Sequence, residues 1–110
     1  MKLEMIKDIA SEIKTSKNNI ALQLELIIEY INKSNSKNQS KYDPVSESFK
    51  NKFNLLINNL SEIEDEITYA IKNESFNNYQ YKRIKEKILI INHQSKKFEN
   101  LMYNKLFNKN

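Results

Sequence analysis

Isoleucine recurs every seven residues at the start of the chain, at Ile6, Ile13, Ile20 and Ile27. A companion line follows four positions later and consists of Ala10, Lys17, Leu24 and Ile31. This alternation of three and four residues is typical of the buried side of a helix in a bundle or coiled coil. We therefore predict a helix from about Lys2 to Lys33. Residues 15–19 are poor helix formers, so a break there, giving four helices in all, stays open, although the unchanged phase favours one helix.

Two further helical stripes, meaning lines of apolar residues along one side of a helix, follow in the sequence. Asp43-Pro44 is a good helix start, because the aspartate caps free amides and a proline in the first turn loses no hydrogen bond. From Phe49 to Ile71 the four-three spacing is kept throughout, and a third stripe runs from Tyr81 to Met102, ending near Phe107. The polar stretches 34–42 and 72–78 read as connectors, and the candidate caps of the third helix are Ser75, Asn77 and Asn78.

The three stripes predict one all-α domain over residues 1–110, an elongated up-down-up bundle of three long helices with coiled-coil-like packing. Connectors this short require each helix to return beside the one before it. The residues that we expect in the core are Ile13, Ile20, Leu24, Ile27, Phe53, Leu56, Leu60, Ile63, Ile67, Ile84, Ile88, Ile91 and Phe98.

Composition excludes several kinds of chemistry. The chain has no glycine and no cysteine, so it holds no phosphate-binding glycine loop, nucleophile elbow or thiol nucleophile. The single histidine, His93, has no partners for a catalytic triad. Glu62 and Glu66 share a helix face as di-iron ligands do, but the Glu-x-x-His pairs of such sites are missing. We expect no catalytic residue, metal or cofactor, and interpret the acidic run 62–66 as a charged face that pairs with the third helix.

Positive charge is concentrated at the end of the chain. The net charge is +4, and residues 75–110 hold eight basic and two acidic side chains, a net +6. Four of the basic residues, at paired heptad positions, are candidates for phosphate contact, namely Lys82, Arg83, Lys96 and Lys97. Only one of them is arginine and no helix-turn-helix spacing is present, so we favour a solvated face over a nucleic-acid interface.

Apolar residues beside the stripes exceed what one narrow seam needs, as Leu22, Ile28, Leu55, Ile57 and Ile90 illustrate. They indicate either a wider core within the monomer or a second surface that binds another helix. A homodimer is one form of such binding. On the third helix, the residues that we expect to contact a partner protein are Tyr79, Tyr81, Ile90 and Tyr103.

The chain also resembles the small helical-bundle immunity proteins of the enterocin and pediocin type. The likeness lies in Lys41-Tyr42-Asp43-Pro44, the long amphipathic helix after it, and the last helix beginning Tyr79-Gln80-Tyr81-Lys82. It implies an antiparallel four-helix bundle, with a break near residues 15–19, and a cytoplasmic protein that protects its producer by engaging the sugar-transporter receptor of the bacteriocin. The missing glycine and the continuous first stripe depart from that family.

These observations favour a non-catalytic protein that acts by stoichiometric binding of another protein. Secretion or flagellar export chaperones and phage-type inhibitors fit the same pattern, and a non-specific nucleic-acid-binding protein is the alternative from another class. The apolar runs are too short to cross a bilayer, and Glu4 and Asp8 interrupt any signal-peptide core. We therefore expect a cytoplasmic location.

Overall fold

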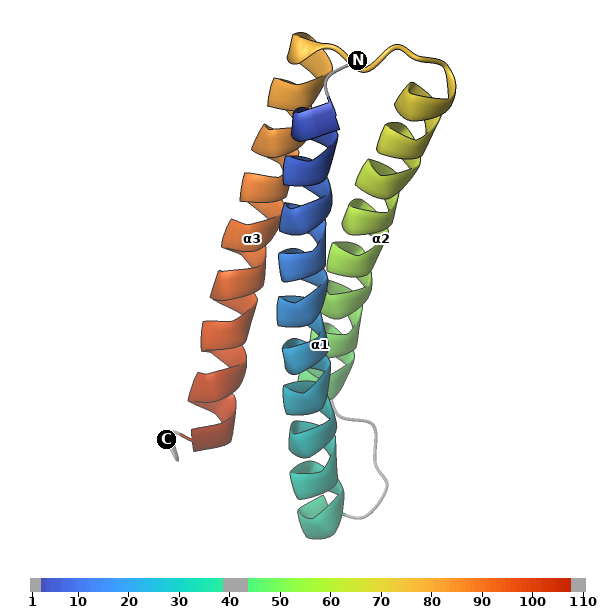
Figure 1. The fold of residues 1–110 in the computed structure, drawn as a ribbon. Helices are drawn as coiled ribbons and strands as arrows, with labels where there is room; N and C mark the ends of the chain where they lie inside the picture. Colours follow the sequence, from blue (N-terminus) through green and yellow to red (C-terminus); the bar gives the residue numbers. More distant parts are fainter. Residues whose placement is uncertain (1–2, 39–43, 108–110) are drawn as a thin grey trace.

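The computed structural model describes residues 3–38 and 44–107, in which every regular element is a helix. The elements are α1 (Leu3–Asn38), α2 (Pro44–Lys72) and α3 (Asn78–Phe107). Figure 1 shows α1 and α3 running in one direction and α2 running in the opposite direction. The N-terminus lies at the end of the bundle where α2 connects to α3. The molecule measures 55 × 22 × 16 Å, and each helix contacts the other two. The elongated up-down-up bundle is thus confirmed.

The first helix does not break. The polar side chains of residues 15–19 are accommodated within it, because Thr15 Oγ1 bonds the Ser11 carbonyl at 3.2 Å and Ser16 Oγ donates to Asn92 Oδ1 of α3 at 2.7 Å. The four-helix alternative is therefore wrong. The helix also runs to Asn38, five residues past the predicted end, so the first part of the expected connector is helical. The rest of that connector, with Tyr42 and the predicted Asp43 cap, lies outside the described residues.

The buried side of α1 differs from the prediction in its second line. The isoleucines from Ile13 onward are buried, but their companions lie three residues later instead of four: Ile9, Ser16 and Gln23 are buried, whereas Ala10 is exposed and Leu24 is 42% exposed. The reason is a polar match with α3. The Gln23 Nε2 donates to the Ser95 carbonyl at 2.9 Å and also contacts the Ser95 hydroxyl, so this seam pairs an amide nitrogen that hydropathy alone would place outside, while Gln23 Oε1 is buried without a hydrogen-bond partner.

The rest of the predicted core is confirmed, except that Phe53 is only half-buried. Phe49 joins the three helices near one end of the bundle, because its ring meets Tyr30 of α1 edge-on at 5.2 Å and Phe98 of α3 at 5.7 Å. Two further buried residues are Phe76, in the turn before α3, and Met102, in the last part of α3. The core therefore runs the full length of the bundle as a narrow column between three helices.

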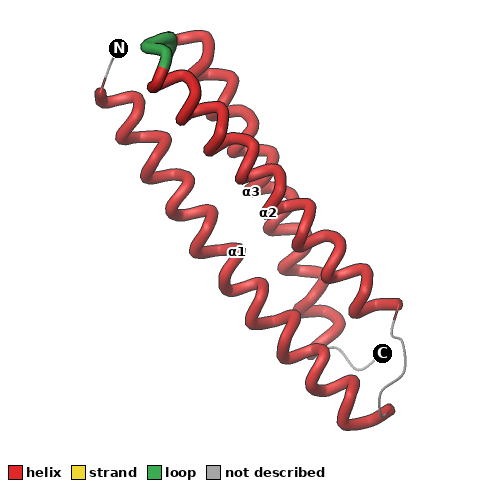
Figure 2. Tube along the Cα trace, turned by 90° about the vertical axis from the view of Figure 1, so that its right-hand side faces the viewer, coloured by secondary structure: helices red, strands yellow, loops and turns green. Residues whose placement is uncertain are grey.

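A tight turn connects α2 to α3, drawn as the green loop in Figure 2. The amide of Ser75 donates to the Ala70 carbonyl at 2.9 Å and that of Glu74 to the Ile71 carbonyl at 3.1 Å, which is the Schellman pattern of a helix end. Asn77 then caps α3: its Oδ1 accepts the Gln80 amide at 3.0 Å, and its own amide donates to Gln80 Oε1 at 2.9 Å. This reciprocal capping box selects Asn77 from the three predicted caps.

Candidate protein-binding surfaces

Of the residues considered for catalysis or metal binding, His93 and Glu62 are exposed and Glu66 forms ion pairs. No group of three or more acidic or histidine side chains is placed to hold a metal within residues 3–38 and 44–107. Glu66 pairs with Arg83 and, at 3.1 Å, with Lys87. The expected pairing of the acidic run with the third helix is therefore confirmed for Glu66, whereas Glu64 pairs with Lys17 of α1.

The four residues predicted to contact a partner do not form one surface. Tyr79 and Ile90 are 71% and 58% exposed and lie on the side of α3 toward α2, whereas Tyr81 and Tyr103 lie toward α1. Tyr103 stacks on Phe107 at 5.6 Å. Tyr79 and Tyr103 are also 24 residues apart, which is about 36 Å along a helix. No single partner element contacts all four.

Tyr81 is instead part of an ion-pair cluster between α1 and α3. Its hydroxyl donates to the Asp8 carboxylate, which also accepts a hydrogen bond from Lys85 Nζ at 2.8 Å. Lys85 in turn pairs with Glu12 at 2.6 Å. The hydrogen bond from Lys85, and then that from Tyr81, lowers the pKa of Asp8 below its usual 3.8. The same carboxylate raises the pKa of Tyr81. The cluster holds two helices together, so the Tyr81 hydroxyl already has an internal partner.

The basic residues are largely engaged as well. Arg83 pairs with Glu66, and Lys96 lies 3.8 Å from Glu99. Among the described residues, Lys82 and Lys97 make no ion pair, and 15 residues, or about 22 Å along α3, separate them. The predicted phosphate-binding set is thus divided between internal pairs and two separate lysines.

The groove between α2 and α3 brings together one residue from each predicted set. It consists of two adjoining hollows of about 370 and 220 Å³ that share Gln94. Ile90 lines the smaller hollow and Lys97 the larger one. We call this surface the α2–α3 groove; its lining residues are Lys52, Leu55, Leu56, Asn59, Glu62, Ile63, Lys87, Ile90, Ile91, Gln94, Lys97, Phe98 and Leu101.

The floor of the α2–α3 groove is apolar, and its charged lining residues are three lysines, Lys52, Lys87 and Lys97, and one glutamate, Glu62. Phe98 is buried at the base, Leu101 is half-buried, and Leu55 remains 57% exposed on the wall. Lys52 and Lys97 stand at the rim with no ion pair to another described residue. Sequence analysis singled out Leu55 and Ile90 as surplus apolar residues but missed Lys52 and Leu101. Periodicity shows which side of a helix is buried, but it does not show which neighbouring helix packs on each side of the buried stripe.

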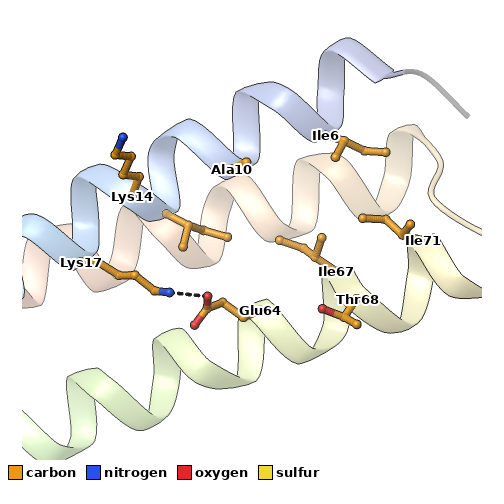
Figure 3. A pocket seen from close by; sticks show the side chains of 9 residues that line it. Ile6, Ala10, Lys14, Lys17, Glu64, Ile67, Thr68 and Ile71 are labelled. Carbon is orange, nitrogen blue, oxygen red and sulfur yellow. Dashed lines mark ion pairs between the residues drawn. The ribbon is translucent and has the colours of Figure 1, made fainter.

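A second hollow, of about 370 Å³, lies between α1 and α2 and is shown in Figure 3. Its walls are apolar, with Ile6 and Ala10 from α1 facing Ile67 and Ile71 from α2. At one end Lys17 Nζ meets Glu64 Oε2 at 2.6 Å, the dashed contact in Figure 3. The bundle thus has two open apolar faces on either side of α2.

Comparison with protein-family models, curated proteins and solved structures finds no match to this chain. The class of the protein is therefore defined by its fold, an all-α three-helix bundle. In the part of the chain that the structure describes, no helix is both long and apolar enough to span a membrane.

Proposed function

We propose that the protein acts without catalysis, by stoichiometric binding of another protein in the α2–α3 groove. The observation that carries this proposal is the pair of adjoining hollows, where Leu55 and Ile90 remain more than half exposed beside the buried Phe98. Exposed apolar side chains around a concave surface are typical of protein interfaces. Burying them against a partner would remove this apolar area from water.

The partner element that fits best is an amphipathic helix with acidic side chains beside its apolar face. The groove follows α3 from Lys87 to Leu101, which is about 21 Å, or about four helical turns. Helices commonly bind in such grooves through apolar residues on successive turns. The acidic side chains of the partner helix would lie beside Lys52 and Lys97 at the rim. These charge contacts would fix the orientation of the partner more than they would raise its affinity.

Among classes of proteins that work in this way, we propose a bacteriocin-immunity-type role in the cytoplasm, which rests on the sequence resemblance alone. The single unbroken α1 departs from the four helices of that family. An export chaperone or phage-type inhibitor would use the same groove in the same manner. The shared mechanism, capture of a partner helix, is the part of the proposal that the groove supports.

The test compares two adjacent residues on α3. Ile90→Glu places a charge inside the groove, whereas Leu89→Glu alters a neighbour that is 64% exposed and outside both hollows. The tagged protein and both variants are incubated with extract of the source cells at low and high salt, and bound protein and nucleic acid are identified. One protein retained at high salt, lost with Ile90→Glu and kept with Leu89→Glu, is the expected result.

The nucleic-acid alternative predicts a different outcome in the same experiment. Phosphate contacts make affinity fall by about 0.9 log units per contact for each log unit of salt on duplex DNA. Recovery of nucleic acid alone, eluting as salt rises and weakened by Lys82→Ala but not by Ile90→Glu, would overturn the protein-binding proposal.

A further inference from the structure

The strongest additional feature is the exposed face that α1 and α2 form together, on the other side of α2 from the groove. It continues the hollow of Figure 3 along the bundle at equivalent heptad positions. We call it the α1–α2 face; its two lines of residues are Leu3, Ala10, Lys17, Leu24 and Ile31 on α1 and Lys50, Ile57, Glu64 and Ile71 on α2. The α1 line contains the four residues of the companion line that sequence analysis placed on the buried side of the first helix.

This face is apolar enough to need a partner. Leu3, Leu24 and Ile57 are 62%, 42% and 40% exposed, and Ile71 is 36% exposed. Seven-residue spacing of such residues is what one helix surface presents to another in a coiled coil or bundle. The monomer leaves this seam uncovered along most of α1.

The two lines carry one pair of opposite charges, Lys17 and Glu64, which lie side by side near the middle. A further lysine, Lys50, stands at one end of the α2 line. Lys14, which also borders the hollow, points away from it in Figure 3. Apolar residues lie on both sides of the central pair, and a second copy can place an opposite charge against each member of that pair.

We propose that the α1–α2 face binds a second copy of this chain, with a twofold axis parallel to the helices. Two twofold arrangements can bring the face against itself. An axis across the helices would put Lys17 on the partner's Lys17 and Glu64 on the partner's Glu64. An axis along them puts α1 against the partner's α2, so each Lys17 meets the partner's Glu64. The charges select the second arrangement, in which α1 and α2 of both copies form a four-helix core.

The dimensions agree with a dimer. The face is about 42 Å long on α1, from Leu3 to Ile31, and about 32 Å long on α2, from Lys50 to Ile71, and two adjacent helices make it about 20 Å wide. It thus offers on the order of 800 Å² per copy, the area that a standard stable interface buries on each partner. The α2–α3 groove lies on the other flank of α2 and stays open in this dimer.

The first test uses exposed positions, where substitution leaves the fold intact. Sedimentation of the wild type at micromolar concentration should give about 26 kDa, twice the 13.1 kDa of one chain. Leu24→Glu should give the monomer mass, whereas Leu22→Glu, at a position 58% exposed outside both lines, should leave the dimer intact. A wild type that sediments only at 13.1 kDa, or a Leu24→Glu variant that still dimerises, would overturn the proposal.

A charge exchange tests whether Lys17 and Glu64 lie at the interface between the two copies. Lys17→Glu and Glu64→Lys should each be monomeric, because each would gather four like charges at the interface. An equimolar mixture of the two variants should recover the dimer mass, since every contact between the two chains then joins opposite charges. Failure of the mixture to dimerise, with circular dichroism showing both chains helical, would contradict the place of these residues at the interface.

Cysteine cross-linking tests the direction of the twofold axis. The chain has no native cysteine, so every disulfide must form between the introduced residues. In the proposed dimer Leu24 faces the partner's Ile57 across the interface, as Lys17 faces Glu64. A mixture of Leu24→Cys and Ile57→Cys chains should therefore form a mixed disulfide. A mixture of Leu24→Cys and Ala10→Cys chains should not, because those positions meet only if the axis crosses the helices. The opposite result would overturn the arrangement.

Discussion

Glu74 shows how a chain without glycine ends a helix. Its φ is 51°, in the left-handed region that glycine adopts easily and other residues avoid. The Schellman hydrogen bonds of Ser75 and Glu74 hold the turn in place despite the side chain. A glutamate here also puts negative charge at the negative end of the α2 dipole. The short turn is therefore formed at a local energetic cost.

Replacing Glu74 with glycine should raise stability. We expect Glu74→Gly to increase the free energy of unfolding by about 1 kcal/mol in urea titration, because the left-handed conformation no longer opposes a β-carbon. Glu74→Ala is the control: it removes the charge but keeps the β-carbon. Equal stability of the glycine and alanine variants would show that backbone strain is not the cause.

Asp8 gives the fold a measurable response to acid. Its pKa is lowered in the folded state, first by the hydrogen bond from Lys85 and then by that from Tyr81. A lowered carboxyl pKa stabilises the fold above the usual value of 3.8, and this contribution is lost as pH falls through the folded value. The loss should begin below about pH 5 and continue below pH 4, as the carboxylate becomes protonated.

The comparison that isolates Asp8 is unfolding of wild type and Asp8→Asn across that range. At neutral pH the variant should be the less stable of the two, and the difference should shrink as pH falls from about 5 to about 3. Asp65 is exposed and makes no ion pair with another described residue, so Asp65→Asn serves as a control for carboxylate loss in general. A difference that does not change with pH would contradict the assigned role of the Asp8 carboxylate.

At the scale of the helices, hydrophobic spacing predicted three long elements, their order and nearly all of the α2 and α3 core. It did so because apolar residues spaced alternately by three and four positions lie on one side of a helix, where burial against a neighbouring helix is favourable. It misplaced the second line of α1, since Ser16 and Gln23 are polar, and their burial is favourable only beside Asn92 and Ser95 of α3. Such a match between distant polar residues is not visible in local periodicity.

Ile9 tests this register directly, because it is fully buried and was absent from the predicted core. Ile9→Ala should lower the free energy of unfolding by about 2–5 kcal/mol, through lost transfer energy and the cavity left behind. Leu22→Ala, at an exposed position of the same helix, should change it by less than about 0.5 kcal/mol. Similarly small losses of unfolding free energy for both variants would contradict this register and would support the predicted one, in which Ala10 and Leu24 are buried.

For the whole molecule, α2 lies between two open apolar surfaces with different charges. The α2–α3 groove has lysines at its rim, whereas the α1–α2 face carries one balanced pair at its centre. The sequence indicated surplus apolar residues but not which of them line the same surface. A residue beside the buried stripe of one helix lines the surface with whichever helix packs on that side, and this neighbour is not visible in the sequence. Tyr81 illustrates the difficulty: its hydroxyl is used by Asp8 inside the bundle.

The measurement that tests the central claim most directly is site-specific photo-cross-linking from the α2–α3 groove in source cells. A photoreactive side chain at Leu55 or Leu101 should cross-link one protein in a single helical segment with acidic flanks. The same group at Leu22 or Leu89, which are exposed elsewhere, should not cross-link it. Equal cross-linking from all four positions, or products only from Leu22 and Leu89, would contradict binding in this groove.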